Sequence, residues 1–222
     1  MHDAHRIRNL IHRVDPYEGF DVGGRTPDLQ GWGSQAPIFE EVISQVRPSL
    51  ILEVGTWKGA SAIHMATLCK KHGLHETRIV CVDTWLGALE FWLNHEDADR
   101  YGSLRLRNGY PSVYETFLAN VVLSGHQDMI VPFPVPSGLA ARFFQIHGVQ
   151  FPLIYIDASH EYEDVRSDLD HFWKCVAPGG RMFGDDFSVY WPGVVRAVME
   201  FSERVHVPYT HGDSKWQISR PQ

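Results

Sequence analysis

The chain has 222 residues, of which 44% are hydrophobic and 21% are charged, a size and balance typical of one globular domain. A formal net charge of −7 without a long basic run argues against a protein that binds nucleic acid. No apolar run is long enough to span a membrane, and the three cysteines lack metal-like or disulfide-like spacing, so we expect a cytoplasmic protein without membrane attachment.

The N-terminal part of the chain predicts two helices joined by a loop. Apolar residues at helical spacing favour a short amphipathic helix over residues 5–14. Residues 15–35 are rich in Gly, Pro and Asp and are typical of a loop. A second helix is expected over 36–46, with Ser34 as a candidate cap.

From residue 49 onward, short apolar runs alternate with amphipathic stretches. The expected strands are 49–54, 78–83, 129–133, 151–157 and 181–185, with two short candidates in the tail at 206–209 and 215–219. The expected helices are 60–72, 112–124, 137–147, 161–176 and 193–205, and residues 178–180 are expected to form a turn. This alternation predicts a mainly parallel sheet with helices on both faces.

Residues 84–111 interrupt the alternation. They combine several aromatic residues with many charges and several glycines. A connection of this length within a compact domain is usually functional. We therefore expect this insertion to form a substrate lid.

Two of the predicted strands end in acidic residues. The run 151–156 ends at Asp157, with His160 three residues later, and the run 181–184 ends at Asp185 and Asp186. If these strands are parallel neighbours, three carboxylates and an imidazole meet at the sheet edge where open α/β sheets bind ligands. Paired carboxylates repel unless a positive charge neutralises them. The pattern therefore favours a divalent cation and a general base.

Each of these residues also has an ordinary interpretation. Asp157 could simply terminate a strand, and Asp185 and Asp186 could lie in a solvated turn. The chain has 13 histidines, so a histidine such as His160 near any site is not unusual. The sequence alone leaves these alternatives open.

A glycine-containing loop follows the first expected strand. It reads EVGTWKGAS from Glu53 to Ser61 and leads into a helix, where free N–H groups suit an anion. The second expected strand ends at Asp83, and an acid at that place holds ribose hydroxyls in dinucleotide folds. The loop meets only half of the dinucleotide fingerprint, and it is not a P-loop. Lys58 within it is interpreted as a solvent-facing side chain.

Four segments together resemble a known family. They are EVGTWKGAS, VCVDTW, IDASHEYEDV and APGGRMFGDD. They are similar to class I S-adenosylmethionine-dependent O-methyltransferases, in the cation-dependent branch that includes catechol and macrolide-sugar O-methyltransferases (methyltransferase family 24-like). The resemblance runs from about residue 36 to the end. It implies one domain over 1–222, with a Rossmann-like α/β fold: a mainly parallel seven-stranded sheet, helices on both faces and an antiparallel C-terminal hairpin.

The resemblance also implies which residues would bind S-adenosylmethionine. Ser61 falls where the family binds the methionine carboxylate, Asp83 would take the ribose hydroxyls, and Pro136 and Ser137 lie near the adenine pocket. The full set of implied cofactor residues is Glu53, Gly55, Trp57, Gly59, Ser61, Asp83, Pro136, Ser137 and Asp157.

The same comparison implies a metal site and a base. Asp157, Asp185 and Asp186 match the family's metal ligands, and the implied ion is Mg²⁺ or another divalent cation. His160 matches the base of the macrolide-sugar branch. The catechol branch has a lysine at that place, which this chain lacks. The implied acceptor is therefore a small-molecule hydroxyl, on a sugar or natural-product alcohol rather than a catechol.

Other functions stay open at this point. One is a related tailoring enzyme of the antibiotic-hydroxylase type, and another is a non-catalytic partner subunit that keeps the cofactor fold. A nicotinamide enzyme is disfavoured because the middle glycine of its fingerprint is missing. Self-association as a homo-oligomer is also left open, through the N-terminal helix and exposed aromatic residues.

Overall fold

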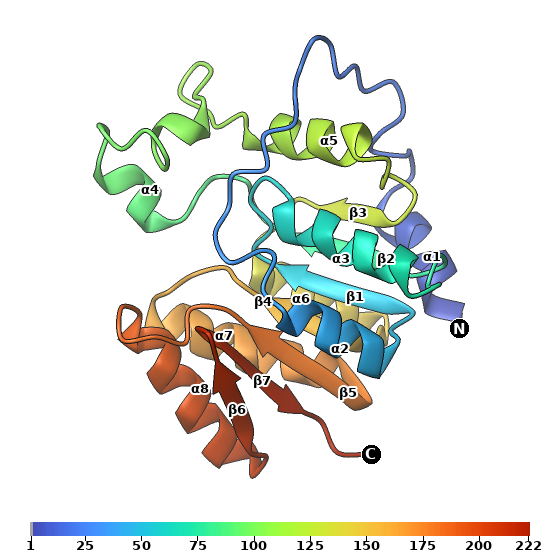
Figure 1. The fold of residues 1–222 in the computed structure, drawn as a ribbon, viewed down its shortest axis with the longest axis vertical. Coiled ribbons are helices and arrows are strands. Elements are labelled where there is room, and N and C mark those ends of the chain that lie inside the picture. The colour runs from blue at the N-terminus through green and yellow to red at the C-terminus, as the bar shows by residue number, and fades with distance from the viewer. Residues whose placement is uncertain (1) are drawn as a thin grey trace.

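A computed structural model describes residues 2–222, with side chains from residue 6 onward. It contains a seven-stranded sheet in the order β3-β2-β1-β4-β5-β7-β6 (Figure 1). The strands are β1 (Leu50–Val54), β2 (Arg78–Val82), β3 (Ile130–Phe133), β4 (Phe151–Ile156), β5 (Val176–Gly184), β6 (Tyr209–Gly212) and β7 (Lys215–Ser219). The first five strands pair in parallel, and β7 and β6 add an antiparallel hairpin at one edge. The predicted fold class is confirmed.

Helices cover both faces of the sheet (Figure 1). They are α1 (His2–Ile11), α2 (Ile38–Val46), α3 (Ala60–Lys71), α4 (Leu89–Leu93), α5 (Val113–Leu123), α6 (Ser137–Ile146), α7 (Tyr162–Phe172) and α8 (Pro192–Val205), with short 3-10 turns at Gly102–Leu104 and Trp173–Cys175. Among the described residues, none of the helices has the length and apolarity needed to span a bilayer.

The core consists of two apolar layers, one on each side of the sheet. Leu52 and Val54 of β1 point into the layer formed with α6, α7 and α8, whereas Ile51 points into the layer formed with α2, α3 and α5. Successive residues of a strand face opposite sides. Because both sides are covered, the parallel strands are mostly apolar, with Glu53 of β1 as a buried acid among them. This explains why these strands were visible in the sequence as short continuous apolar runs.

The topology creates a crevice next to β1. The chain runs from β1 outward to β2 and β3 and then crosses back to β4, so β1 has neighbours from both halves of the fold. At such a switch point the loops after the central strands diverge and leave room for a ligand.

The end of β1 is packed tightly against the end of β4. Gly55 has φ +82°, and a Cβ atom on it would lie 1.9 Å from the carbonyl oxygen of Asp157.

Some predicted elements differ from the structure. The tail strand predicted at 206–209 begins only at Tyr209, because Pro208 cannot donate a sheet hydrogen bond. The turn predicted at 178–180 is an irregularity in the pairing of β4 with β5. The insertion 84–111 is not a plain loop, since it contains α4 and a 3-10 turn.

Candidate active site

A cleft of about 640 Å³ opens at the carboxyl ends of the central strands. Its walls include the N-terminal loop, the loop after β1, the insertion, the start of α6, and the two segments that follow β4 and β5. The cleft therefore lies where the strand order predicts ligand binding.

Asp83 organises the loop after β1. Its Oδ2 accepts the backbone N–H groups of Thr56 and Trp57, each at 2.8 Å, and its Oδ1 accepts that of Trp85 at 2.7 Å. Burial raises the pKa of Asp83 above its usual range, and the backbone donors oppose this rise. The carboxylate, predicted to hold ribose, lines the cleft and also fixes the loop beside it.

Glu53 lies behind the same loop rather than in the cleft. It is fully buried, accepts a hydrogen bond from Thr56 Oγ1 at 2.9 Å, and accepts one from the Ser61 hydroxyl. Burial raises the pKa of Glu53 to about 7. Glu53 thus holds two cleft-lining residues, Thr56 and Ser61, from the buried side of the loop. The Ser61 hydroxyl points toward Glu53.

The interpretation of Lys58 as solvent-facing is wrong. Its side chain is only 3% exposed, and its Nζ donates to the two oxygens of Asp28 at 3.0 and 3.1 Å and to Ser103 Oγ at 3.1 Å. Arg105 Nη2 also contacts Asp28, at 2.9 Å. These contacts connect the N-terminal loop and the insertion to the loop after β1. The partners are too far apart in the sequence for the contacts to be predicted from it.

Of the other predicted cofactor residues, all but Gly59 line the cleft. Trp57 has φ +52°, donates from Nε1 to Gln30 at 3.0 Å, and packs edge-on against Phe91 with ring centroids 4.6 Å apart. Pro136 and Ser137 line the cleft at the start of α6. At Gly59, with φ +88°, a Cβ atom would lie 2.9 Å from the ring of Phe117, so this position requires glycine. Gly59 supports the turn into α3 rather than lining the cleft.

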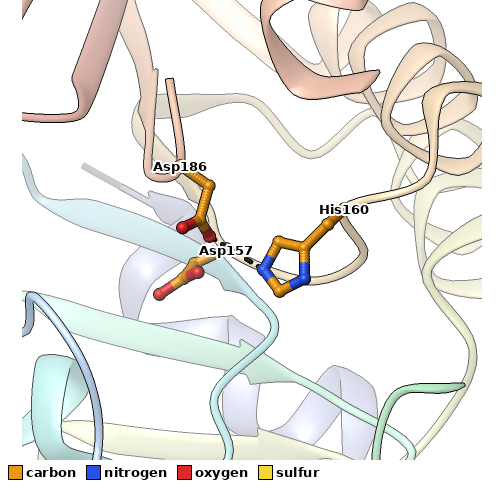
Figure 2. Close-up of side chains that lie close together, drawn as sticks. All are labelled: Asp157, His160 and Asp186. Atoms are coloured by element: carbon orange, nitrogen blue, oxygen red, sulfur yellow. Dashed lines mark ion pairs between the residues drawn. The ribbon is translucent and has the colours of Figure 1, made fainter. Parts of the chain in front are cut away.

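Figure 2 shows Asp157, His160 and Asp186 side by side at the ends of β4 and β5. One nitrogen or oxygen atom from each of these side chains lies within 4.8 Å of the other two. His160 Nε2 lies 2.8 Å from Asp186 Oδ2, and its ring stacks on Trp191 with centroids 3.9 Å apart. Asp157 Oδ2 accepts a hydrogen bond from the Tyr155 hydroxyl at 2.9 Å.

The electrostatics of this cluster show an excess of negative charge. Burial, together with the carboxylates of Asp185 and Asp186, raises the pKa of Asp157 to about 7. Burial disfavours the charged form of His160, but Asp186 and Glu90 outweigh this effect and raise the pKa of His160 to about 10. Both shifts indicate that the cluster would be stabilised by an additional positive charge.

Asp185 faces a different partner from Asp186. Its Oδ2 forms an ion pair with Lys215 Nζ, and its Oδ1 accepts the backbone N–H of Asp186 at 2.8 Å. Asp186 has a positive φ of +63°, a conformation that non-glycine residues seldom adopt and that is often found at functional sites. Of the three predicted ligands, the structure therefore brings Asp157 and Asp186 together with His160 and sets the carboxylate of Asp185 against Lys215.

Glu90 completes the surroundings of His160. It belongs to α4 in the insertion, and its Oε1 lies 2.9 Å from His160 Nδ1. Sequence reasoning missed this residue, because nothing distinguishes Glu90 from the other acids of the insertion. Its position in an expected lid was the sole available signal.

Comparisons with known proteins agree with the fold. A family model described as a methyltransferase domain matches residues 52–187, more than half of the chain. A similar protein from Streptomyces olivaceus is 26% identical over 202 residues, which cover 82% of this chain and 77% of the relative. It is named 8-demethyl-8-(2,3-dimethoxy-alpha-L-rhamnosyl)-tetracenomycin-C 4'-O-methyltransferase.

Solved structures with the same fold are also methyltransferases. The O-methyltransferase TomG from Streptomyces achromogenes, with S-adenosylmethionine bound, has a TM-score of 0.60 at 15% identity, over 99% of this chain and 86% of TomG. The calicheamicin methyltransferase CalS11 has a TM-score of 0.58 at 18% identity, over 82% of this chain and 76% of CalS11. The family match, the fold and the cleft agree: the chain belongs to the methyltransferase-domain family and is a class I S-adenosylmethionine-dependent methyltransferase.

Proposed function

We propose that this enzyme transfers the methyl group of S-adenosylmethionine to a hydroxyl of a small molecule, at a site that holds a divalent cation. The observation that carries the proposal is the cluster of Asp157, His160 and Asp186, which lies in the same cleft as the loop after β1. The relative from Streptomyces olivaceus is named for methylation of a sugar hydroxyl. We therefore favour a sugar or natural-product alcohol as the acceptor over a catechol.

The cofactor in this proposal occupies the part of the cleft beside β1. Gly55 lines this part of the cleft, and its lack of a side chain lets it lie against the backbone of Asp157. Asp83 at the end of β2 is the proposed partner of the ribose hydroxyls, and Pro136 and Ser137 flank the proposed adenine site. Ser61 at the start of α3 is near the proposed position of the methionine part.

The residues at the ends of β4 and β5 fit a hard divalent cation. Mg²⁺ usually binds one or two carboxylates and fills its remaining positions with water or substrate oxygens. Asp157 and Asp186 offer two carboxylates in the cleft. Asp185, which the resemblance implies as a third ligand, is left out because its carboxylate is paired with the buried ammonium of Lys215 and lies outside the cluster of Asp157, His160 and Asp186. A cation bound there would make a coordinated hydroxyl more acidic.

His160 is the proposed acceptor of the hydroxyl proton. A general base must be neutral when it accepts a proton. In the structure, the carboxylates of Asp186 and Glu90 favour the protonated ring, with its pKa raised to about 10 despite burial. His160 can therefore act as a base when positive charge engages Asp186, because this weakens the hold of Asp186 on the proton at Nε2.

Glu90 is the proposed positioning residue for His160. A carboxylate on one ring nitrogen of histidine orients the ring and stabilises its protonated form, as in the Ser-His-Asp arrangement. Glu90 lies 2.9 Å from Nδ1, which leaves Nε2 on the side of Asp186 and the cleft. The insertion 84–111, proposed as a lid over a single-domain enzyme, would thus contribute directly to the reaction.

The proposal is tested by mass spectrometry on a panel of hydroxylated glycosides, incubated with the enzyme, S-adenosylmethionine and Mg²⁺. We expect at least one acceptor to gain the mass of one methyl group. EDTA should abolish the gain, and Mg²⁺ added in excess should restore it. Methylation that resists EDTA would contradict the cation site. Cofactor binding without transfer to any hydroxyl would favour the hydroxylase-type or non-catalytic alternatives.

A further inference from the structure

Lys215 and Asp185 form a buried ion pair directly behind the acidic cluster. Their side chains are 2% and 10% exposed. The register of the sheet holds them in place: β5 pairs antiparallel with β7, and Gly184 lies opposite Trp216. Asp185, the residue after Gly184, therefore lies opposite Lys215, the residue before Trp216. The pair follows from the fold and does not depend on a flexible surface contact.

Each oxygen of Asp185 already has a partner. Lys215 occupies Oδ2, and the backbone N–H of Asp186 occupies Oδ1 at 2.8 Å. The backbone of Asp185 is held as well, because Trp216 Nε1 donates to its carbonyl oxygen at 3.2 Å. A cation bound to the Asp185 carboxylate would lie next to the buried ammonium of Lys215 or would displace it, and either a like-charge contact or an unpaired buried lysine is unfavourable.

Lys215 is also connected to the ligand candidate Asp157. Its Nζ donates to the Tyr155 hydroxyl at 3.1 Å, and this hydroxyl donates to Asp157 Oδ2 at 2.9 Å. The ammonium group lies 5.5 Å from the ring centroid of Phe39. The N-terminal loop closes the other side, because a Cβ atom on Gly33 would lie 2.9 Å from Nζ. Lys215 therefore has no room to swing into solvent.

We propose that Lys215 is a built-in cation of this site: it neutralises Asp185 permanently, so that a divalent metal is held by Asp157 and Asp186 without Asp185. The location of the metal rests on the proposed function, whereas the pairing of Lys215 with Asp185 does not. The number of charged ligands sets the affinity of a carboxylate site for divalent cations. The site should therefore bind a cation more weakly than a three-carboxylate site, and Lys215 should control that affinity.

The test is calorimetric titration of the metal-free protein with Mn²⁺, which prefers the same oxygen ligands as Mg²⁺. The Lys215→Met variant frees the Asp185 carboxylate, so we expect Mn²⁺ to bind about tenfold more tightly or better. The double variant Lys215→Met with Asp185→Asn replaces one neutral pair with another. Its affinity for Mn²⁺ should stay within about threefold of the wild type. Replacement of the exposed Lys174 by Met is the matched control and should change nothing.

Asp157→Asn is the comparison that decides between the two ligand sets. It should weaken Mn²⁺ binding by about tenfold or more, because it removes a proposed ligand. A double variant that loses as much affinity as Asp157→Asn would show that Asp185 is a ligand and would overturn the proposal. The double variant also serves if Lys215→Met alone does not fold, since it leaves no buried charge unpaired. Circular dichroism and S-adenosylmethionine binding check that each variant is folded.

Failure of the proposed function has a different signature. If the wild type binds no Mn²⁺, the cation dependence proposed above is contradicted. In that case Lys215→Met decides the present inference alone. If this variant gains Mn²⁺ binding, the result supports the inference that Lys215 neutralises Asp185 in place of a metal. If it gains none, the inference is overturned.

Discussion

Gly55 offers a sharp test of how the cofactor cleft is built. A Cβ atom at this position would lie 1.9 Å from the carbonyl oxygen of Asp157, whereas an ordinary contact is at least 3.4 Å. The Gly55→Ala variant must therefore move β1 and β4 apart by about 1.5 Å at their carboxyl ends, which is the deficit between these two distances. Alanine at φ +82° adds a cost of about 1–2 kcal/mol, and forced overpacking adds about 1–3 kcal/mol.

We therefore expect Gly55→Ala to lower the free energy of unfolding by about 2–5 kcal/mol and to weaken S-adenosylmethionine binding. Urea denaturation and calorimetry measure the two effects. The control is Gly24→Ala, because Gly24 is exposed and a Cβ atom there would meet nothing within 4 Å. If Gly55→Ala behaved like this control in both assays, the close packing of the two strand ends would be refuted.

Three further predictions concern individual acids. Asp83→Asn turns an amide N–H toward backbone donors, so S-adenosylmethionine affinity measured by calorimetry should fall about tenfold or more; unchanged affinity would contradict its role in the loop. Glu90→Gln should slow methyl transfer about 10²-fold without loss of cofactor affinity. The control variant Glu96→Gln changes an exposed acid of the same insertion and should leave the rate unchanged. If the two variants transferred methyl groups at equal rates, Glu90 would not be a positioning residue. Burial raises the pKa of Glu53 to about 7, so its contribution to stability is greatest below its unfolded pKa and falls, on the order of 3 kcal/mol, as pH rises from about 4.5 through 7. Glu53→Gln should remove this pH dependence in urea titrations, and an unaltered profile would argue against it.

The sheet was predictable because its parallel strands are buried on both faces. The run from 151 to 156 has an apolar residue at nearly every position and ends at an acid, and β4 covers the same residues. Elements without this signal were misplaced. The short α4 lies in a segment of mixed composition, and the first tail strand was predicted across Pro208, at 206–209, whereas β6 begins only at Tyr209. Local composition predicts buried strands well, but it does not predict where an exposed edge strand begins.

The candidate site was only partly predictable for a related reason. Chain order and parallel pairing predict that the acids after β4 and β5 meet, and the structure places Asp157 near Asp186. Both adjacent aspartates line the cleft, but which of them joins Asp157 and His160 depends on the positive φ of Asp186 and on Lys215, thirty residues after Asp185. The role of Glu90 depends in the same way on how the insertion folds back over the cleft. Contacts of this kind are set by tertiary packing and leave no local pattern.

The most direct test of the account is a crystal structure of the enzyme with S-adenosylhomocysteine and Mn²⁺, with the metal located by anomalous scattering. We predict Mn²⁺ bound to carboxylate oxygens of Asp157 and Asp186, in the same cleft as the sulfur of the cofactor product, with Asp185 still paired to Lys215. A metal bound elsewhere, or a cofactor sulfur that lies outside the cleft containing His160, would contradict it.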